Sequence, residues 1–174
     1  RVGYTQKTED GFFEKIDNLM DSARDSLQTK KRVIKKFTDS GLYPYSAYYL
    51  RHIKEAYGYY WSNHFSTIGL VGMAEAIHNF LGTSIASQEG LGFAKKILRF
   101  MRNRLGDYQE ETENIYNLEA TPAEGTSYRL ARIDKMKYPN IIVANENEVK
   151  NGAEPFYTNS SQLPVGQIED LFAA

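Results

Sequence analysis

The segment from Asn117 to Arg132 carries the residue types best suited to chemistry on an anionic ligand. Alternating apolar and polar residues predict a short strand over 116–120. Breakers and small residues predict a turn over 121–125, and a helix is expected from Tyr128 to Asp134. The first backbone N–H groups of a helix have no partner within it, so a turn that leads into a helix can bind phosphate.

Five residues of this turn and helix start are candidate phosphate ligands. Thr126 and Ser127 are typical N-cap residues and carry hydroxyl groups. Backbone N–H groups would come from the small residues of the turn, and a guanidinium would add a charge-assisted contact. The predicted phosphate-binding residues are Ala123, Gly125, Thr126, Ser127 and Arg129.

Two carboxylates lie on the same short loop, at Glu119 and Glu124. Either could act as a general base or bind ribose hydroxyls. Either could equally cap a neighbouring N–H group, and their positions in the sequence do not separate these roles. Both are predicted as candidate catalytic residues.

Several common catalytic patterns are missing from the chain. There is no Walker pattern, and the Gly69–Gly72 pair lacks the third glycine of a dinucleotide-binding loop. Cysteine is absent, which excludes disulfides, thiolate chemistry and cysteine-ligated zinc. No Ser–His–Asp arrangement is convincing. For a lone histidine such as His64, a role in packing or at the solvent-exposed surface is favoured over catalysis.

Composition indicates a globular protein of 174 residues with ordinary apolar and charged content. A net charge of −1 gives no electrostatic case for nucleic acid or an anionic membrane as a partner. No apolar run reaches the ~18 residues that would span a bilayer. We expect a cytoplasmic protein that binds no metal and neither nucleic acid nor membrane.

The rest of the chain must position the loop. Apolar periodicity predicts a long helix from Thr8 to Gly41, with its basic residues 30–36 exposed to solvent. The expected order helix, strand, helix, helix, strand, helix predicts an α/β protein with a parallel sheet. The site would lie at the carboxyl ends of the strands. The expected elements are a strand end at 1–4, a helix at 46–56, a buried strand at 65–71, helices at 73–81 and from Ser87 to about 108, and a helix beginning at 167–170.

Six segments of the chain resemble, in the same order, those of anaerobic (class III) ribonucleoside-triphosphate reductases. The most specific is NLEATPAEGTSYRLA at 117–131. The other matching segments are 1–4, 42–45, 64–73, 108–112 and 157–165. The resemblance covers essentially the whole chain.

The resemblance implies an α/β fold: part of a ten-stranded α/β barrel with several long helices and few parallel strands. It implies one barrel fragment over 1–174 with no second domain. Members of the family convert ribonucleoside triphosphates to deoxyribonucleoside triphosphates. A glycyl radical, installed by a 4Fe–4S activase that uses S-adenosylmethionine, generates a thiyl radical on a cysteine. Formate or a thiol system is the reductant, and a structural zinc and a homodimer are implied for the full-length reductase.

By similarity, the turn at 123–127 would bind substrate phosphates and Glu119 or Glu124 would face the ribose. His64, Ser66, Thr158, Asn159, Ser160 and Gln162 would line the pocket. The sequence departs from the family because it has neither a cysteine nor a glycyl-radical loop. It begins without methionine, and we expect a piece of a longer polypeptide that binds no cofactor and is inactive alone. The alternatives are a non-catalytic nucleoside-triphosphate-binding module and, less well supported, a glycyl-radical lyase relative.

Overall fold

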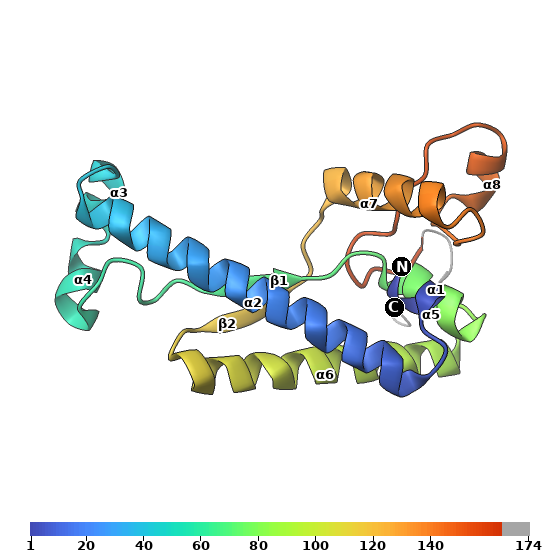
Figure 1. Cartoon of the computed structure of the whole chain (residues 1–174), viewed down its shortest axis with the longest axis horizontal. Coiled ribbons are helices and arrows are strands. Elements are labelled where there is room, and N and C mark those ends of the chain that lie inside the picture. The colour runs from blue at the N-terminus through green and yellow to red at the C-terminus, as the bar shows by residue number, and fades with distance from the viewer. Residues whose placement is uncertain (165–174) are drawn as a thin grey trace, which may run out of the picture. The chain divides into compact units, whose positions relative to one another are not determined.

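The computed structural model describes residues 1–164 and is mainly helical (Figure 1). The helix expected from 167–170 lies outside the described residues. The elements are α1 (Val2–Thr5), α2 (Glu9–Asp39), α3 (Pro44–Tyr49), α4 (Arg51–Tyr57), β1 (Ser66–Gly69), α5 (Met73–Leu81), α6 (Gln88–Thr112), β2 (Tyr116–Glu119), α7 (Glu124–Lys137) and α8 (Glu146–Lys150). Within the described residues, no helix is both long and apolar enough to cross a membrane.

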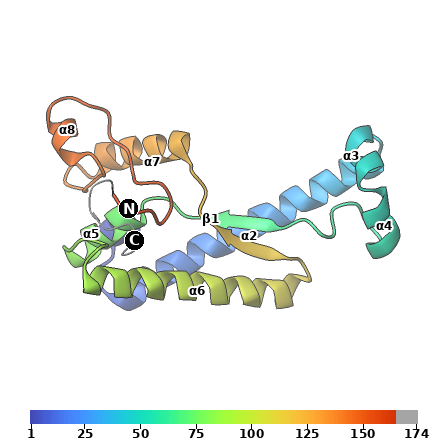
Figure 2. The ribbon, with the colours of Figure 1, turned by 180° about the vertical axis from the view of Figure 1, so that it is seen from behind.

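The strands β1 and β2 pair side by side in a two-stranded sheet (Figure 2). The Ser66 N–H donates to the Ile115 carbonyl at 2.8 Å, and the Thr67 hydroxyl donates to the Asn117 side chain at 2.7 Å. The paired positions rise together along both strands, so the sheet is parallel. The predicted combination of long helices with few parallel strands is confirmed, whereas the ten-stranded barrel stays a prediction.

Capping side chains begin the two longest helices as the sequence predicts. The Thr8 hydroxyl accepts the N–H of Gly11 at 3.2 Å, and the Ser87 hydroxyl accepts that of Gly90 at 2.9 Å. Each bond satisfies an N–H group that has no partner within its helix. Helix α5 ends at Gly82, whose φ of +74° favours glycine.

Two local predictions are wrong. Residues 2–4 belong to the short helix α1, with Arg1 as its N-cap, rather than to a strand end, and this helix packs on α5. A Cβ atom on Gly3 would lie 1.9 Å from the carbonyl oxygen of Ala76, so glycine allows this close approach. The single helix expected at 46–56 is instead two helices, α3 and α4, which join at Leu50.

The chain divides into two compact units. Of the described residues, the first unit comprises Arg1–Ile16, Gly69–Met101 and 119–164. The second unit comprises Asp17–Ile68 and Arg102–Leu118. The single-domain barrel fragment stays a prediction.

A phenylalanine cluster forms part of the core of the first unit. The ring of Phe12 lies 4.9 Å from that of Phe80 and 5.1 Å from that of Phe93, measured between centroids. Phe13 contacts Phe93 and Phe100 at 5.8 and 5.1 Å. These edge-on and tilted contacts hold the start of α2 against α5 and α6.

Two nearby glycines of α6 are expected to respond oppositely to alanine. A Cβ atom on Gly90 would lie 2.1 Å from the Ser84 carbonyl oxygen, whereas one on Gly92 would meet no atom within 4 Å. We expect Gly90→Ala to lower the free energy of unfolding by about 1–3 kcal/mol and Gly92→Ala to raise it by about 0.5–1 kcal/mol. Chemical denaturation of both variants measures this difference, and equal effects would contradict the packing of α6.

An ion-pair network supports the second unit. The Arg104 guanidinium contacts Asp17 at 2.6 Å and Asp21 at 3.0 Å. The buried Tyr108 donates its hydroxyl to Asp21 at 2.7 Å. This hydrogen bond, followed by the charges of Arg24 and Arg104, lowers the pKa of Asp21. A lowered carboxyl pKa stabilises the fold above the unfolded-state pKa, and that stability is lost as the pH falls through the folded-state value.

We expect Tyr108→Phe to raise the pKa of Asp21 toward its ordinary value. We also expect it to lower the free energy of unfolding at neutral pH by about 1 kcal/mol. The difference from wild type should shrink in acid, where Asp21 is protonated in both proteins. Denaturation at several pH values measures the change, with the exposed Tyr45→Phe as the control. A Tyr108→Phe difference that does not vary with pH would rule out the proposed role of Asp21.

Candidate functional site

An open cavity of about 830 Å³ lies in the first unit, beside the N-terminus of α7. Helix α7 contributes Glu124 and Ser127 to its wall, and the segment after Phe156 contributes Thr158, Asn159 and Gln162. The cavity therefore joins two segments that the sequence predicts as parts of one pocket. The remaining lining residues are Ala144, Asn145, Glu148, Ala153, Glu154, Phe156, Tyr157, Leu163 and Pro164.

Helix α7 begins at Glu124, four residues before the predicted start. Its N-cap is Ala123, with φ −120° and ψ 56°, so the prediction that Thr126 and Ser127 cap the helix is wrong. An acidic residue in the first turn is favourable beside the helix dipole, which accounts for the earlier start. The Ser127 N–H already bonds the Ala123 carbonyl at 2.7 Å, so the N–H groups without intrahelical partners belong to 124–126.

Ser127 is buried and connects α7 to the segment at 157. Its hydroxyl donates to the Tyr157 carbonyl and accepts the Tyr157 N–H at 3.0 Å. Tyr157 also packs with Ala131 and Val143 in an apolar cluster. The Ser127 side chain is therefore occupied by protein contacts, and its role here is to position the cavity wall.

Asp134 continues the buried face of α7. One carboxylate oxygen accepts the Tyr157 hydroxyl at 2.9 Å, and the other accepts the Arg1 guanidinium at 2.7 Å. Burial and the Asp134 carboxylate raise the pKa of Tyr157 well above its ordinary value. The Tyr157 hydroxyl acts as a hydrogen-bond donor that links the cavity wall to α7.

Glu75, on the first turn of α5, is 4% exposed and binds the other side of this segment. Its two carboxylate oxygens accept the Thr158 N–H at 3.1 Å and the Thr158 hydroxyl at 2.6 Å. The Gly72 N–H donates in return to the Thr158 carbonyl at 2.9 Å, and the Met73 N–H donates to the Ser160 carbonyl at 3.2 Å. These four bonds fix Thr158–Ser160 to the start of α5.

A left-handed backbone conformation at Gly72 permits this attachment. Its φ is +76°, and a Cβ atom there would lie 3.2 Å from Tyr157 and 3.3 Å from the Glu75 carboxylate. A larger residue would be strained by its φ and crowded by both neighbours. Gly72 is thus required where α5 meets the cavity segment.

Within residues 1–164, the charged side chains that line the cavity are glutamates. The lining includes Glu124, Glu148 and Glu154, and contains no lysine or arginine from the part of the chain that the structure describes. The N-terminal end of the α7 dipole and its free N–H groups supply positive potential at this wall. Carboxylates accept hydrogen bonds, so the acidic side suits sugar hydroxyl groups better than phosphate oxygens.

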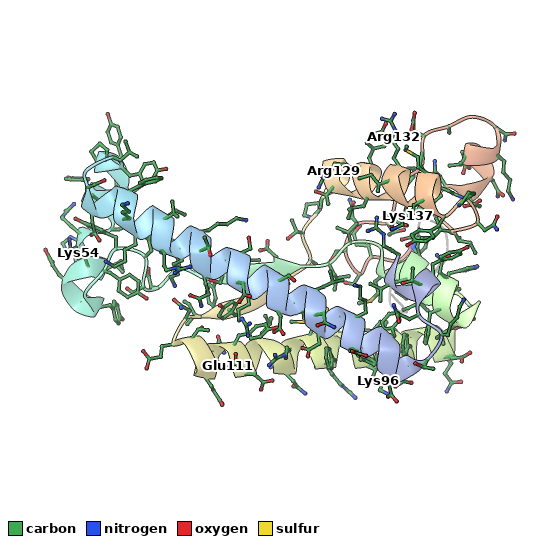
Figure 3. All side chains as sticks on the ribbon, in the orientation of Figure 1. Lys54, Lys96, Glu111, Arg129, Arg132 and Lys137 are labelled. Atoms are coloured by element: carbon green, nitrogen blue, oxygen red, sulfur yellow. The ribbon has the colours of Figure 1, made fainter. Side chains whose placement is uncertain are left out.

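Several predicted site residues do not line this cavity. Arg129 is exposed on α7 (Figure 3), and Gly125 and Thr126 are exposed on the first turn of that helix. Glu119 is exposed at the end of β2, and Ser160 is buried beneath the wall. His64 and Ser66 belong to the second unit, where they line a different cavity.

Among residues 1–164, no group of three His, Asp or Glu side chains could hold a metal ion. Glu148 and Glu154 line the large cavity and belong to the polar stretch before Phe156. The two ends of this stretch are joined by a hydrogen bond of 3.1 Å from the Phe156 N–H to the side-chain oxygen of Asn145.

Sequence reasoning missed three residues that build the wall: Glu75, Asp134 and Tyr157. A weak signal existed for two of them. Glu75 interrupts an otherwise apolar helix start, and Asp134 follows Ser127 and Ala131 at helical spacing. The sequence around Tyr157 does not predict its burial, because an aromatic residue beside polar residues is equally compatible with an exposed turn and with a buried position.

The fold is similar to that in a crystal structure of the anaerobic ribonucleotide reductase from Thermotoga maritima with MES in the active site. The TM-score is 0.65 and the sequence identity is 20%. The match covers 90% of this chain and 24% of that chain, so this chain spans about a quarter of that reductase.

The sequence model of the anaerobic ribonucleoside-triphosphate reductase family matches residues 1–174. The chain belongs to this family, whose members are oxidoreductases, and the resemblance drawn from the sequence motifs is confirmed. No curated protein sequence matches the chain significantly.

Proposed function

We propose that this chain is the part of an anaerobic ribonucleoside-triphosphate reductase that binds the phosphates of the substrate and forms one wall of its pocket. The main support is the single cavity that the N-terminus of α7 shares with Thr158, Asn159 and Gln162. These two segments come from the two most polar motifs of the family resemblance. Family membership supplies the ligand class, a ribonucleoside triphosphate.

In this proposal the phosphates bind at the first turn of α7. The N–H groups of 124–126 have no intrahelical acceptor, and the exposed Thr126 hydroxyl lies on the same turn. Anions bind at helix N-termini because these N–H groups and the helix dipole act together. Arg129 would contribute only long-range attraction, because its exposed side chain belongs to the second turn of α7, beyond the free N–H groups of the first turn.

The ribose would lie toward the acidic side of the cavity. Glu124 lines the cavity and Glu119 does not, which supports Glu124 as the carboxylate that faces the sugar. A carboxylate can accept hydrogen bonds from ribose hydroxyls or take a proton from one. Thr158, Asn159 and Gln162 would supply further hydrogen bonds from the opposite wall.

The radical chemistry expected of the family does not fit residues of this chain. It contains no cysteine, so none of its residues can become the thiyl radical or ligate zinc through sulfur. We assign the glycyl radical, its activase, the reductant and the homodimer contacts to the full-length reductase, and we expect the 174-residue chain alone not to reduce ribonucleotides. The barrel fold and a cytoplasmic location belong to the same proposal.

The phosphate assignment is tested by titrating the purified chain with a ribonucleoside triphosphate and with the matching nucleoside. We expect Thr126→Ala to weaken triphosphate binding about threefold to tenfold, through loss of one hydrogen bond to a charged group. Arg129→Ala should have a smaller effect that high salt removes. Neither change should alter nucleoside binding. Unchanged triphosphate affinity in the double variant would contradict the assignment.

A further inference from the structure

A strongly basic stretch of α2 in the second unit has no part in the nucleotide site. Five of the seven residues at 30–36 are lysine or arginine, in a chain whose net charge is −1. Lys35 pairs with Asp39 at 2.9 Å, and Lys54 of α4 reaches the same carboxylate at 3.6 Å. Within residues 1–164, the other four cations of this stretch contact no carboxylate; they are Lys30, Lys31, Arg32 and Lys36.

Lys31 differs from the other three because its side chain is partly buried. Its ammonium group has only a long contact of 3.5 Å to the His64 carbonyl and lies 6.0 Å from the ring of Tyr59. Burial lowers the pKa of Lys31. A partly buried cation without a carboxylate is a group that an anionic partner would stabilise.

Lys31 lies at the wall of a cavity of about 270 Å³. Helix α2 lines one side with Leu27, Lys30, Lys31 and Ile34, and the segment before β1 lines the other with Trp61, His64, Phe65 and Ser66. The walls are mainly aliphatic and aromatic, and the two lysines supply the charge. The size suits one apolar side chain rather than a large ligand.

The aromatic wall is held in place. The Trp61 indole N–H donates to the Thr38 hydroxyl at 2.9 Å, and the indole packs edge-on against the His64 ring at 4.9 Å. Because its polar atom already has a partner, the indole offers the cavity an apolar surface. A preformed apolar wall lowers the entropic cost of binding.

Exposed tyrosines are found on both α3 and α4, and Figure 3 marks Lys54 on α4. Tyr45 is 81% exposed and Tyr49 is 76% exposed, and Arg51 stacks on Tyr48 at 4.4 Å. Exposed tyrosine together with basic side chains is typical of protein interaction surfaces.

We propose that residues 30–36 of α2, with the cavity beside Lys31, form a docking surface for an acidic protein segment that inserts one apolar side chain into the cavity. The four cations without a carboxylate partner among the described residues require a negatively charged partner, and the apolar cavity requires an apolar side chain as its anchor. A cavity of about 270 Å³ accommodates one inserted side chain, whereas single-stranded nucleic acid binds by stacking successive bases along a longer groove.

The test uses the 174-residue chain and a fluorescein-labelled peptide in which two glutamates flank a phenylalanine on each side. The matched peptide has alanine in place of phenylalanine. We expect saturable binding of the first peptide in fluorescence anisotropy, at least about tenfold weaker binding of the second, and weakening with added salt. Equal affinity for the two peptides, or no saturable binding, would overturn the proposal.

Two surface variants locate the binding. Lys31→Met and Ile34→Ser should each weaken peptide binding about tenfold, whereas Lys95→Met, which removes an exposed lysine of α6, should leave it unchanged. Circular dichroism confirms that each variant is folded. An oligothymidylate is titrated in parallel. Tighter binding of the oligothymidylate than of the peptide, or an unchanged affinity in Lys31→Met, would overturn the assignment of an acidic protein partner.

Discussion

Glu124→Pro is expected to bind a ribonucleoside triphosphate about 10- to 100-fold more weakly than Glu124→Ala. Both variants lose the carboxylate, and they differ by the backbone N–H at the first position of α7. A hydrogen bond from an N–H group to a charged oxygen contributes about 1.5–3 kcal/mol, which corresponds to this range of affinity. The comparison therefore isolates one N–H group of the proposed phosphate site.

Proline is suited to this position, because the first helical residue has no intrahelical bond to lose and already adopts the φ of proline. Helix α7 should consequently form in both variants, which circular dichroism can verify. Isothermal titration with the triphosphate and with the nucleoside gives the two affinities. Equal triphosphate affinity in the two variants would remove the α7 N-terminus from the phosphate site.

Glu75→Ala is expected to cause the largest loss of stability among the residues of the cavity wall. The change leaves the Thr158 N–H and hydroxyl without their acceptors and removes a buried carboxylate. We expect the free energy of unfolding to fall by about 2–4 kcal/mol, because buried polar groups that lose their partners incur their full desolvation cost. The wall at Thr158–Ser160 should loosen with it.

The control is Glu89→Ala, which removes an exposed glutamate from the first turn of α6. We expect that change to cost only about 0.3–1 kcal/mol, through the helix dipole. Denaturation gives the stabilities, and hydrogen exchange at the Thr158 amide reports the loosening. Equal costs for the two changes, with the Thr158 amide still protected, would show that Glu75 does not hold the wall.

Local patterns in the sequence were sufficient for the long helices. The apolar spacing of α2 and α6 and the capping residues Thr8 and Ser87 act within one or two turns, so they can be read without tertiary information. The end of α5 at Gly82 follows from the same kind of rule. For these elements, short-range physics was sufficient.

Predictions failed where a tertiary contact decides the local structure. Ser127 reads as a cap because its hydroxyl could accept a local N–H, but the fold uses that hydroxyl for Tyr157, 30 residues away. The first four residues read as a strand end, whereas Val2–Thr5 form a helix in which Gly3 packs on α5. Glu75 and Thr158 are 83 residues apart, and no periodicity links them.

The two segments that line the cavity were recognisable in the sequence, but the residues that hold them in place were not. The motif around Glu124 and the polar stretch from Thr158 to Gln162 were both expected at one pocket, and they line one cavity. The residues that fix them there, Glu75 and Asp134, are carboxylates whose spacing gives only a weak sign of burial. Only the folded chain shows that both are buried.

The most direct test of the proposed nucleotide pocket is a crystal structure of the chain soaked with a ribonucleoside triphosphate. We expect phosphate oxygens within hydrogen-bond distance of the N–H groups of residues 124–126, with the ribose between Glu124 and Thr158. A triphosphate bound away from the N-terminus of α7, with the cavity beside Ser127 left free, would contradict it.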